Sequence, residues 1–352
     1  MFAKFGDGQT KWPLAVVLGL AGSLVVTIIV LAFLWPTKTQ SAHNLPVSIA
    51  GPTESVATLE QVLETASPDT FDFVAADDRD DALSQVEDRD TYGAIVLSDD
   101  PTAAPEVLKA TAASPVAAQM LTAIATQLTT QLQEQVQAAG GDPSTVSVTV
   151  TEVTELADGD PTGAALAAAT LPLAMGGMIG GALVAFGVKG TGRKIVALAT
   201  YGVGAGLILA AVLGPWFEFL PGAYGMNAIA IGTAVVSTAS LLVGLHSLLG
   251  GPGFGLGAVI TMFIGNPIAG AAQPWQFLPT PWGAIGQHMV PGASNYLIKS
   301  VNYFPDAATW PQWLTLACWI AAGVILLVLG RYAGNGKKLK LAQLEAAAAS
   351  AE

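Results

Sequence analysis

Few residues of this chain have the type and spacing that chemistry requires. Asp77, Asp78, Asp80 and Asp81 could offer carboxylate oxygens to calcium, but they lack the spacing, the glycine and the closing glutamate of an EF-hand loop. We interpret them as an acidic helix start or a solvated loop. The stretch 187–194 resembles a phosphate-binding loop. An arginine replaces the expected lysine there and no hydroxyl residue follows, so we interpret it as a basic turn.

The residues that usually bind metals or act as nucleophiles are scattered. The histidines are His43, His246 and His288, and Cys318 is the only cysteine. No His-Glu-x-x-His or paired-cysteine spacing is present, so we expect no metal site. A Gly-x-Ser-x-Gly motif is also missing. The sequence therefore predicts neither an enzyme nor a bound cofactor.

The most unusual polar residues lie in a hydrophobic, repeatedly broken stretch from Gly265 to Trp310. Its prolines and glycines prevent a continuous membrane span. We interpret it as short helices in the outer leaflet, where irregular backbone either lines a cavity or forms a buried structural cap. The candidate residues of a substrate path are Asn266, Pro267, Gln273, Gln287, His288, Pro291, Gly292 and, from an earlier loop, Glu218. For Glu218 a solvated loop position is the favoured interpretation.

Six apolar segments are long enough to cross a bilayer as helices, since a hydrocarbon core of about 30 Å needs about 20 residues. They contain no Asp, Glu or Lys. The first exceeds the usual apolar region of a signal peptide, so we interpret it as an uncleaved anchor. The fifth is interrupted by Asn266-Pro267. The predicted spans are 13–35, 163–188, 195–217, 225–249, 254–273 and 312–333.

The charged residues divide the chain into two compositions. Only 11% of the 352 residues are charged, against about 25% in soluble domains. From Pro36 to Pro161 there are 21 acidic and 4 basic residues, whereas the rest of the chain has 5 acidic and 10 basic ones. A soluble insert within a membrane protein explains this asymmetry. A nucleic-acid partner is excluded, because it would need a basic surface.

The lysines and arginines of the loops and tails predict the orientation, because cytoplasmic segments carry their excess. Those of the termini and of the loop between the second and third spans fall on one side. We therefore expect a membrane protein with both termini in the cytoplasm and residues 36–161 outside. The predicted parts are the N-terminus 1–12, the first span 13–35, the outer domain 36–161, the bundle 162–333 with its outer-leaflet segment 274–311, and the tail 334–352.

Within the insert, strand and helix patterns alternate. Segments 45–50, 70–75 and 92–97 are predicted strands, and helical patterns lie between them, which indicates a small α/β domain. A long helix is predicted over 115–138, with an apolar residue at every fourth position. We favour packing on its own sheet over pairing with a partner subunit. A last strand is predicted over 145–153.

Glycines of the second predicted span form two overlapping small-xxx-small pairs. These are Gly176 with Gly180, and Gly177 with Gly181. Such pairs let helices approach closely. The sequence leaves open whether the neighbouring helix belongs to the same bundle or to a partner subunit.

The order of one span, an outer α/β domain and five further spans resembles the ABC-2 type transporter membrane family. Within that family the chain is similar to the YhgE/Pip (phage infection protein)-like branch of bacterial membrane proteins, which implies a location in the bacterial plasma membrane. The resemblance is strongest at the motifs that follow residue 264. The matching segments are 45–50, 93–97, 265–270, 277–279, 282–287, 291–293, 303–304 and 313–319.

The resemblance implies an export permease that works as a dimer with a separate cytoplasmic ATPase subunit. Such permeases carry a coupling helix between the second and third spans. Here that loop is only Lys189 to Lys194, too short for more than about one turn. We expect a membrane export component for a hydrophobic or amphiphilic substrate. The alternatives are an envelope scaffold or receptor without a motor, and half of a proton-driven exporter of the resistance-nodulation-division kind. The lack of a carboxylate within the spans argues against the last.

Overall fold

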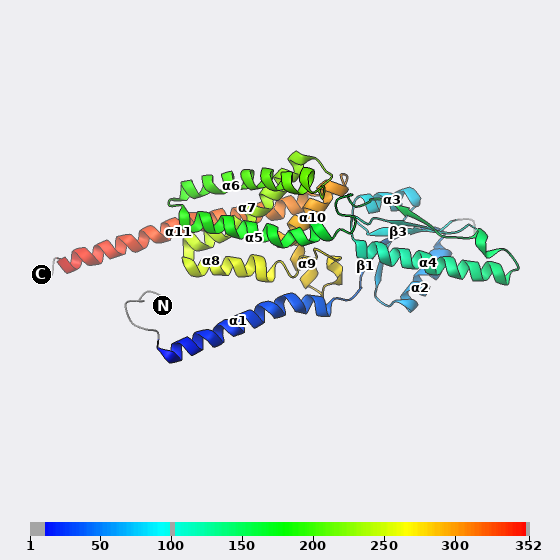
Figure 1. Ribbon diagram of the computed structural model, residues 1–352, viewed down its shortest axis with the longest axis horizontal. Coiled ribbons are helices and arrows are strands. Elements are labelled where there is room, and N and C mark those ends of the chain that lie inside the picture. The colour runs from blue at the N-terminus through cyan, green and yellow to red at the C-terminus, as the bar shows by residue number, and fades with distance from the viewer. Residues whose placement is uncertain (1–10, 99–102, 350–352) are drawn as a thin grey trace.

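The structure, a computed structural model, describes residues 11–98 and 103–349. Most of the predicted N-terminus 1–12 and the end of the predicted tail 334–352 lie outside the described residues. Figure 1 shows an elongated molecule with long helices at one end and a β-sheet flanked by helices at the other. The N-terminal end of the first helix and the C-terminal end of the last lie at the end away from the sheet.

Within the described residues, five helices are long and apolar enough to cross a bilayer, which makes the chain a polytopic helical membrane protein. A helix suits these segments because it satisfies every backbone group without water. The spans lie in α1 (Trp12–Thr39), α5 (Ala164–Gly187), α6 (Thr191–Ala211) with the π-turn η2 (Val212–Trp216), α7 (Tyr224–Leu249) and α11 (Trp310–Ala349).

The predicted span over 254–273 is shorter in the structure than expected. The chain is helical only over α8 (Gly251–Ala258) and the π-turn η3 (Val259–Ile264). At about 1.5 Å per residue this helix is about 21 Å long, less than a hydrocarbon core of about 30 Å. Asn266-Pro267 explains the early end, because proline lacks the N–H that a helix uses and disfavours helical backbone in the residue before it.

Helix α7 is the centre of the bundle and packs against α5, α6, α10 and α11. Most of its span is buried, unlike the other four spans. Close approach of backbones makes this possible. A methyl group at Gly232 of α7 would lie only 2.6 Å from the carbonyl oxygen of Gly202 on α6, so neither helix could come this close with a larger residue there.

The predicted small-xxx-small pairs lie on α5. Gly177 and Gly181 are buried against α7, and Gly180 lies against the ring of Tyr201 on α6. The Tyr201 hydroxyl donates a hydrogen bond to the carbonyl oxygen of Gly176 at 2.6 Å. All four glycines therefore contact or adjoin helices of the same chain.

The insert contains a five-stranded sheet with the order β2-β1-β3-β4-β5. Neighbouring strands are parallel except β3 and β4. The first strand forms at the predicted residues 45–50, whereas β4 is absent from the sequence prediction because a four-residue strand after Pro105 gives too short a pattern. The strands are β1 (Leu45–Ala50), β2 (Phe71–Ala76), β3 (Gly93–Val96), β4 (Glu106–Lys109) and β5 (Thr149–Glu152).

Helices cover both faces of the sheet. On one face, α2 (Thr53–Ala66) and α4 (Pro115–Ala138) bury Leu59, Leu63 and Leu121 against the strands. On the other face, α3 (Arg79–Glu87) contributes Ala82 and Val86. The long helix α4 has the predicted bounds and packs on its own sheet with its N-terminal half, while its C-terminal half extends past the sheet (Figure 1).

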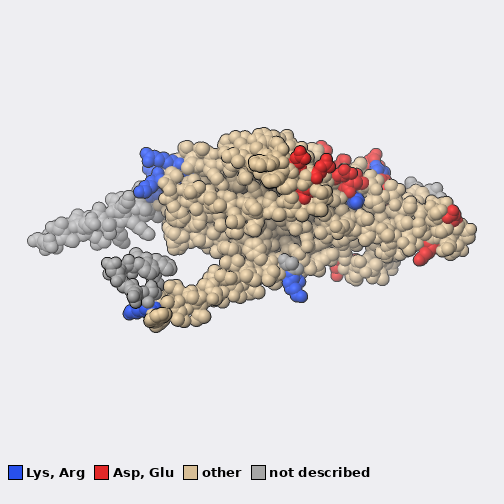
Figure 2. Space-filling view, in the orientation of Figure 1, with Lys and Arg blue, Asp and Glu red and all other residues tan. Residues whose placement is uncertain are grey.

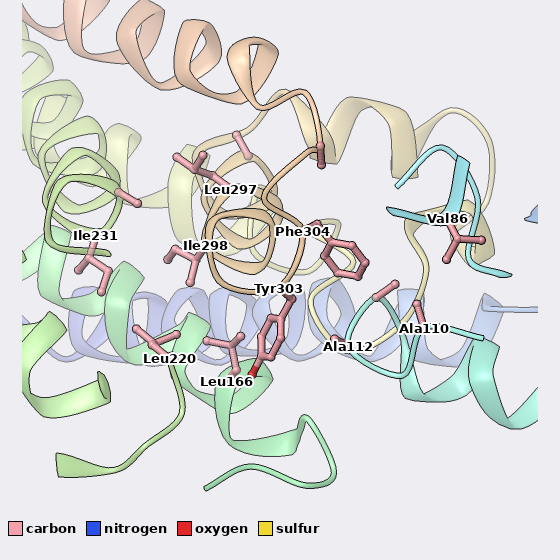
Figure 3. Packing of buried hydrophobic residues seen from close by; sticks show 14 of the residues in the cluster. Val86, Ala110, Ala112, Leu166, Leu220, Ile231, Leu297, Ile298, Tyr303 and Phe304 are labelled. Carbon is pink, nitrogen blue, oxygen red and sulfur yellow. The ribbon is translucent and has the colours of Figure 1, made fainter. Parts of the chain in front are cut away.

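The core on the α3 side of the sheet continues into the helix bundle. Figure 3 shows Val86 and Ala110 of the insert in one cluster with Phe304, which follows α10 (Val290–Tyr303), and with Ile231 of α7. Leu297 and Phe304 are almost completely buried. Because the apolar core continues across the junction, the sheet and its helices pack directly against the helix bundle.

Helix α1 packs least among the spans, and its apolar side chains are exposed. Contacts occur near its C-terminal end. Trp35 packs edge-on against Trp282 with ring centroids 6.2 Å apart, and the Ser41 N–H donates to the Phe277 carbonyl oxygen at 3.3 Å. Figure 1 shows the rest of α1 diverging from the bundle. In a bilayer this surface is solvated by lipid, which is as apolar as the helix.

Candidate functional site

The part of the broken stretch between η3 and α10 is compactly folded and mostly irregular backbone. It contains a turn at 265–268, the 3-10 helix η4 (Trp275–Phe277) and α9 (Trp282–Gln287). A methyl group at Gly286 would overlap the carbonyl oxygen of Ile268, and one at Gly292 would overlap that of Gly286. Glycine at these positions lets the turn, α9 and α10 pack backbone against backbone.

The predicted substrate-path residues of this stretch differ in their surroundings. The Gln287 side chain donates from Nε2 to the Ala269 carbonyl oxygen at 3.1 Å. The backbone carbonyl of His288 accepts a hydrogen bond from Trp319 Nε1 of α11 at 2.9 Å, and the residue itself is exposed. This arrangement favours a structural cap. Asn266, Pro267 and Gln273 are half-buried in turns, while Pro291 and Gly292 are buried at the start of α10.

The remaining predicted candidate, Glu218, lines a cavity of about 520 Å³ where α6 and α7 meet the insert. Asp158 is a second carboxylate in its wall, and Asn227 supplies an amide. Both acidic residues are exposed, and no lysine or arginine of the described residues lines the wall, so the cavity is negatively charged. The other wall residues are Leu156, Ala157, Ala210, Gly214, Pro215, Leu220, Pro221, Gly222 and Tyr224.

The backbone at Glu218 is unusual. Its φ angle is 58°, in the left-handed region that side chains other than glycine rarely adopt. The Glu218 N–H donates to the Gly214 carbonyl oxygen at 2.6 Å, which closes the end of α6. Residue Gly159 packs directly against the backbone of 217–218, so the segment after β5 and the end of α6 form one wall.

Two asparagines fix the opposite wall. Asn227 Nδ2 donates to Asn302 Oδ1 at 3.0 Å, and Asn302 Nδ2 donates back to Asn227 Oδ1 at 2.7 Å. Asn302 Oδ1 also accepts the Gly222 N–H at 2.9 Å. Since Asn227 is buried and each amide is paired, these groups hold the 217–223 loop between α7 and α10 and leave little freedom for this wall.

A second cavity, of about 420 Å³, lies between the sheet and the broken stretch. Asn44 and Asp72 of the insert face Trp275 and Gln276 across it. The Gln276 Oε1 atom also accepts a hydrogen bond from the Tyr92 hydroxyl at 3.2 Å. The insert and the broken stretch therefore share polar groups as well as apolar core.

Two basic residues lie at the centre of the junction, Arg89 after α3 and Lys299 on α10. The Arg89 guanidinium stacks 3.9 Å from the centroid of the Tyr296 ring and donates to Ser300 Oγ at 2.7 Å. Lys299 Nζ donates to the Ala113 carbonyl oxygen at 3.4 Å. Neither cation forms an ion pair with a carboxylate of the described residues.

Burial of the Lys299 ammonium lowers its pKa to about 8. The Arg89 charge lowers the pKa further, and the more distant Asp160 opposes the shift. Asp160 itself is buried and accepts the N–H groups of Ala165 and Leu166 at 3.0 and 2.8 Å, so it caps α5. The junction thus holds two positive charges with little compensation.

Sequence reasoning missed this basic pair, although a signal was present. Lys299 is the only lysine or arginine between Lys194 and Arg331, inside a stretch interpreted as outer-leaflet backbone. An isolated charge in an apolar stretch is a candidate for a specific partner. Arg89 carried no comparable signal, because it stands among many charged residues of the insert.

The acidic cluster of the insert forms a helix start. Asp78 accepts the Asp81 N–H at 2.9 Å as N-cap of α3, and Asp81 accepts the Asp77 N–H at 2.9 Å. Nearby, Arg79 binds Glu106 of β4 through two hydrogen bonds, which lowers the pKa of the glutamate. Over residues 11–98 and 103–349, no group of His, Cys, Asp or Glu is arranged to hold a metal ion.

Comparison with known proteins adds no relative to this description. No protein-family model, curated protein or solved structure matches the chain.

Proposed function

We propose that this chain is the membrane component of a bacterial envelope exporter of the ABC-2 permease type, which moves an amphiphilic molecule across the plasma membrane. It works as a homo- or heterodimer with a separate cytoplasmic ATPase subunit. The insert stands outside the membrane. The chain itself performs no covalent chemistry.

The carrying observation is the cavity lined by Asp158 and Glu218. It lies at the end of two apolar helices and beside the insert, where a bilayer would give way to water. Its wall combines two carboxylates and an amide with apolar groups such as Leu156 and Leu220. Such a wall suits a molecule with an apolar part and a cationic or hydroxyl-rich head.

The distribution of charge supports the proposed orientation. In Figure 2 the basic side chains gather mainly at the end of the bundle away from the sheet, whereas acidic side chains gather at the junction and appear at a few places on the insert. The basic residues at the α5–α6 turn are Lys189 of the connection and Arg193 and Lys194 at the start of α6, and Arg331 lies in the C-terminal part of α11. Cytoplasmic loops carry this excess of lysine and arginine.

The test uses a deletion strain of the bacterium that carries the gene, exposed to alkylammonium amphiphiles. We expect deletion to cause accumulation and sensitivity, and the wild-type gene to restore resistance. The double variant Asp158→Asn/Glu218→Gln removes the cavity's charge and should restore little resistance. Asp306→Asn, which changes an exposed carboxylate outside the cavity wall, is the matched control and should restore it fully.

Cross-linking of the tagged chain in native membranes tests whether it assembles with an ATPase subunit and as a dimer. A stoichiometric ATPase subunit and a dimer are the expected products. Recovery of the chain alone, together with full complementation by the double variant, would contradict the proposal.

One observation favours a second candidate, an envelope scaffold or receptor without a motor. Only residues 188–190 connect α5 to α6, so this connection has no room for a helix that an ATPase could engage. In that case the deletion strain would accumulate no amphiphile, and cross-linking would capture an envelope protein on the insert.

A further inference from the structure

The surface of the bundle has an apolar groove of about 450 Å³ between α6 and α7, bounded by Ile320 of α11. Its walls are aliphatic side chains and glycines, and Thr233 is the only residue with a polar side chain in the lining. Val203 and Ile229 form its rims, with 65% and 59% of their surfaces exposed. The cavity that contains Glu218 is bounded instead by residues 156–158, so the groove is a separate feature.

Small residues create the groove. Gly202 and Gly232 bring the two helices so close that larger residues on either side stand out as walls. At Gly225, near the top, no other atom lies within 4 Å of where a methyl group would be. The groove is therefore open space between two tightly packed helices.

The length of the groove is close to the thickness of one leaflet of a bilayer. It extends over residues 199–207 of α6 and 225–236 of α7, which at about 1.5 Å per residue is about 12–17 Å. Half of a hydrocarbon core of about 30 Å is about 15 Å. The exposed Tyr224, whose hydroxyl donates to the Leu207 carbonyl oxygen at 2.9 Å, marks the upper end, at the level where aromatic residues meet lipid headgroups. The groove thus spans one leaflet, the one next to the insert.

We propose that this groove binds one acyl chain of a phospholipid from the leaflet next to the insert. A transmembrane helix of a second copy is the competing occupant, and the test distinguishes the two by cross-linking. An acyl chain fits a lining with almost no polar groups and is present at this depth in every bilayer. The inference requires that α6, α7 and α11 span the membrane, and it does not depend on transport.

The test uses the full chain in nanodiscs that contain a phospholipid with a diazirine in the middle of one acyl chain. After irradiation, mass spectrometry maps the labelled residues. We expect labelling to concentrate on Val203 and Ile229 over Val196 and Ile208, which are similarly exposed apolar residues of α6 outside the groove.

Gly225→Phe places a bulky side chain on a groove residue where an added methyl group would meet open space. It should reduce the groove labelling about tenfold, the equivalent of excluding about two methylene groups from an apolar site. The control is Gly204→Phe, at another glycine with nothing within 4 Å and outside the groove, which should leave the labelling unchanged. If Gly225→Phe does not give a monodisperse protein, Val203→Trp takes its place.

Two results would overturn the inference. One is even labelling of the groove and of Val196 and Ile208, unaffected by the filling variant. The other is cross-linking of groove residues to a second copy of the chain, because a protein surface would then occupy the groove.

Discussion

At the residue scale, the junction between insert and bundle contains two buried positive charges without carboxylate partners. Lys299 contacts a carbonyl oxygen and lies near Arg89, and both have lost part of their hydration. A buried cation without a carboxylate partner destabilises the folded state unless other contacts offset the cost. The stacking of Arg89 on Tyr296 is one such contact.

The lowered pKa of Lys299 predicts how stability depends on pH. From its ordinary value of 10.5 the pKa falls to about 8, so between these values the unfolded chain holds a proton that the folded chain has lost. The free energy of unfolding therefore rises with pH across this window and is lowest, for this group, below pH 8. Thermal unfolding in detergent, followed by tryptophan fluorescence from pH 7 to 10.5, measures the effect.

Lys299→Met should raise the free energy of unfolding at pH 7 by about 1–2 kcal/mol, an amount reduced because part of the side chain still contacts solvent. It should also flatten the rise between pH 8 and 10.5. Lys109→Met is the control, since Lys109 pairs with Glu152 near the surface and should change stability by less than about 1 kcal/mol. An unchanged pH profile in Lys299→Met would contradict the assigned cause.

At the element scale, the broken stretch is built from backbone-to-backbone contacts. We expect Gly286→Ala to disrupt it, because the new methyl group would overlap the Ile268 carbonyl oxygen and force α9 away from the preceding turn. The expected loss is about 2–4 kcal/mol, since overpacking against rigid backbone leaves no low-cost adjustment. Unfolding in detergent by urea measures it.

Gly255→Ala is the matched control for this prediction. Gly255 lies in α8, and nothing is within 4 Å of an added methyl group there. Alanine should be neutral or stabilising by up to about 1 kcal/mol, because it favours helix over the unfolded chain. Equal destabilisation by both substitutions would show that the close contact at Gly286 does not cause the loss of stability.

Elements were predicted to different degrees by their patterns. The long helix α4 and strand β1 have the predicted bounds, because amphipathic spacing over many residues and a run of apolar residues are strong signals. β4 was missed and β5 covers only part of the predicted 145–153, since four-residue strands depend on neighbours supplied by the sheet. The predicted fifth span is shorter than expected. Its hydropathy suits a membrane, but the helix ends at Ile264, before Asn266-Pro267.

At the scale of the whole molecule, the charge distribution predicts the orientation. In a Cys318→Ser background, Ala57→Cys on α2 and Gly192→Cys on α6 place single thiols at opposite ends of the molecule. Both positions are exposed, and neither substitution removes a basic residue that sets topology. A membrane-impermeant maleimide added to spheroplasts should label position 57 and spare position 192.

Permeabilised spheroplasts provide the control, because both thiols should then react. Labelling of position 192 in intact spheroplasts would reverse the proposed orientation. The exporter proposal would fail with it, since the insert and the carboxylate-lined cavity would face the cytoplasm.

The sequence by itself determined what depends on composition and on neighbours along the chain. Hydropathy located the apolar helices, charge separated the insert from the bundle, and periodicity located α4. Tertiary structure alone decided what depends on residues far apart in the sequence. Arg89 meets Tyr296, Asn227 meets Asn302, and Asp158 shares a cavity with Glu218 only because an apolar core joins the sheet to the bundle. No local pattern records such contacts, because the two partners of each pair stand in segments far apart along the chain.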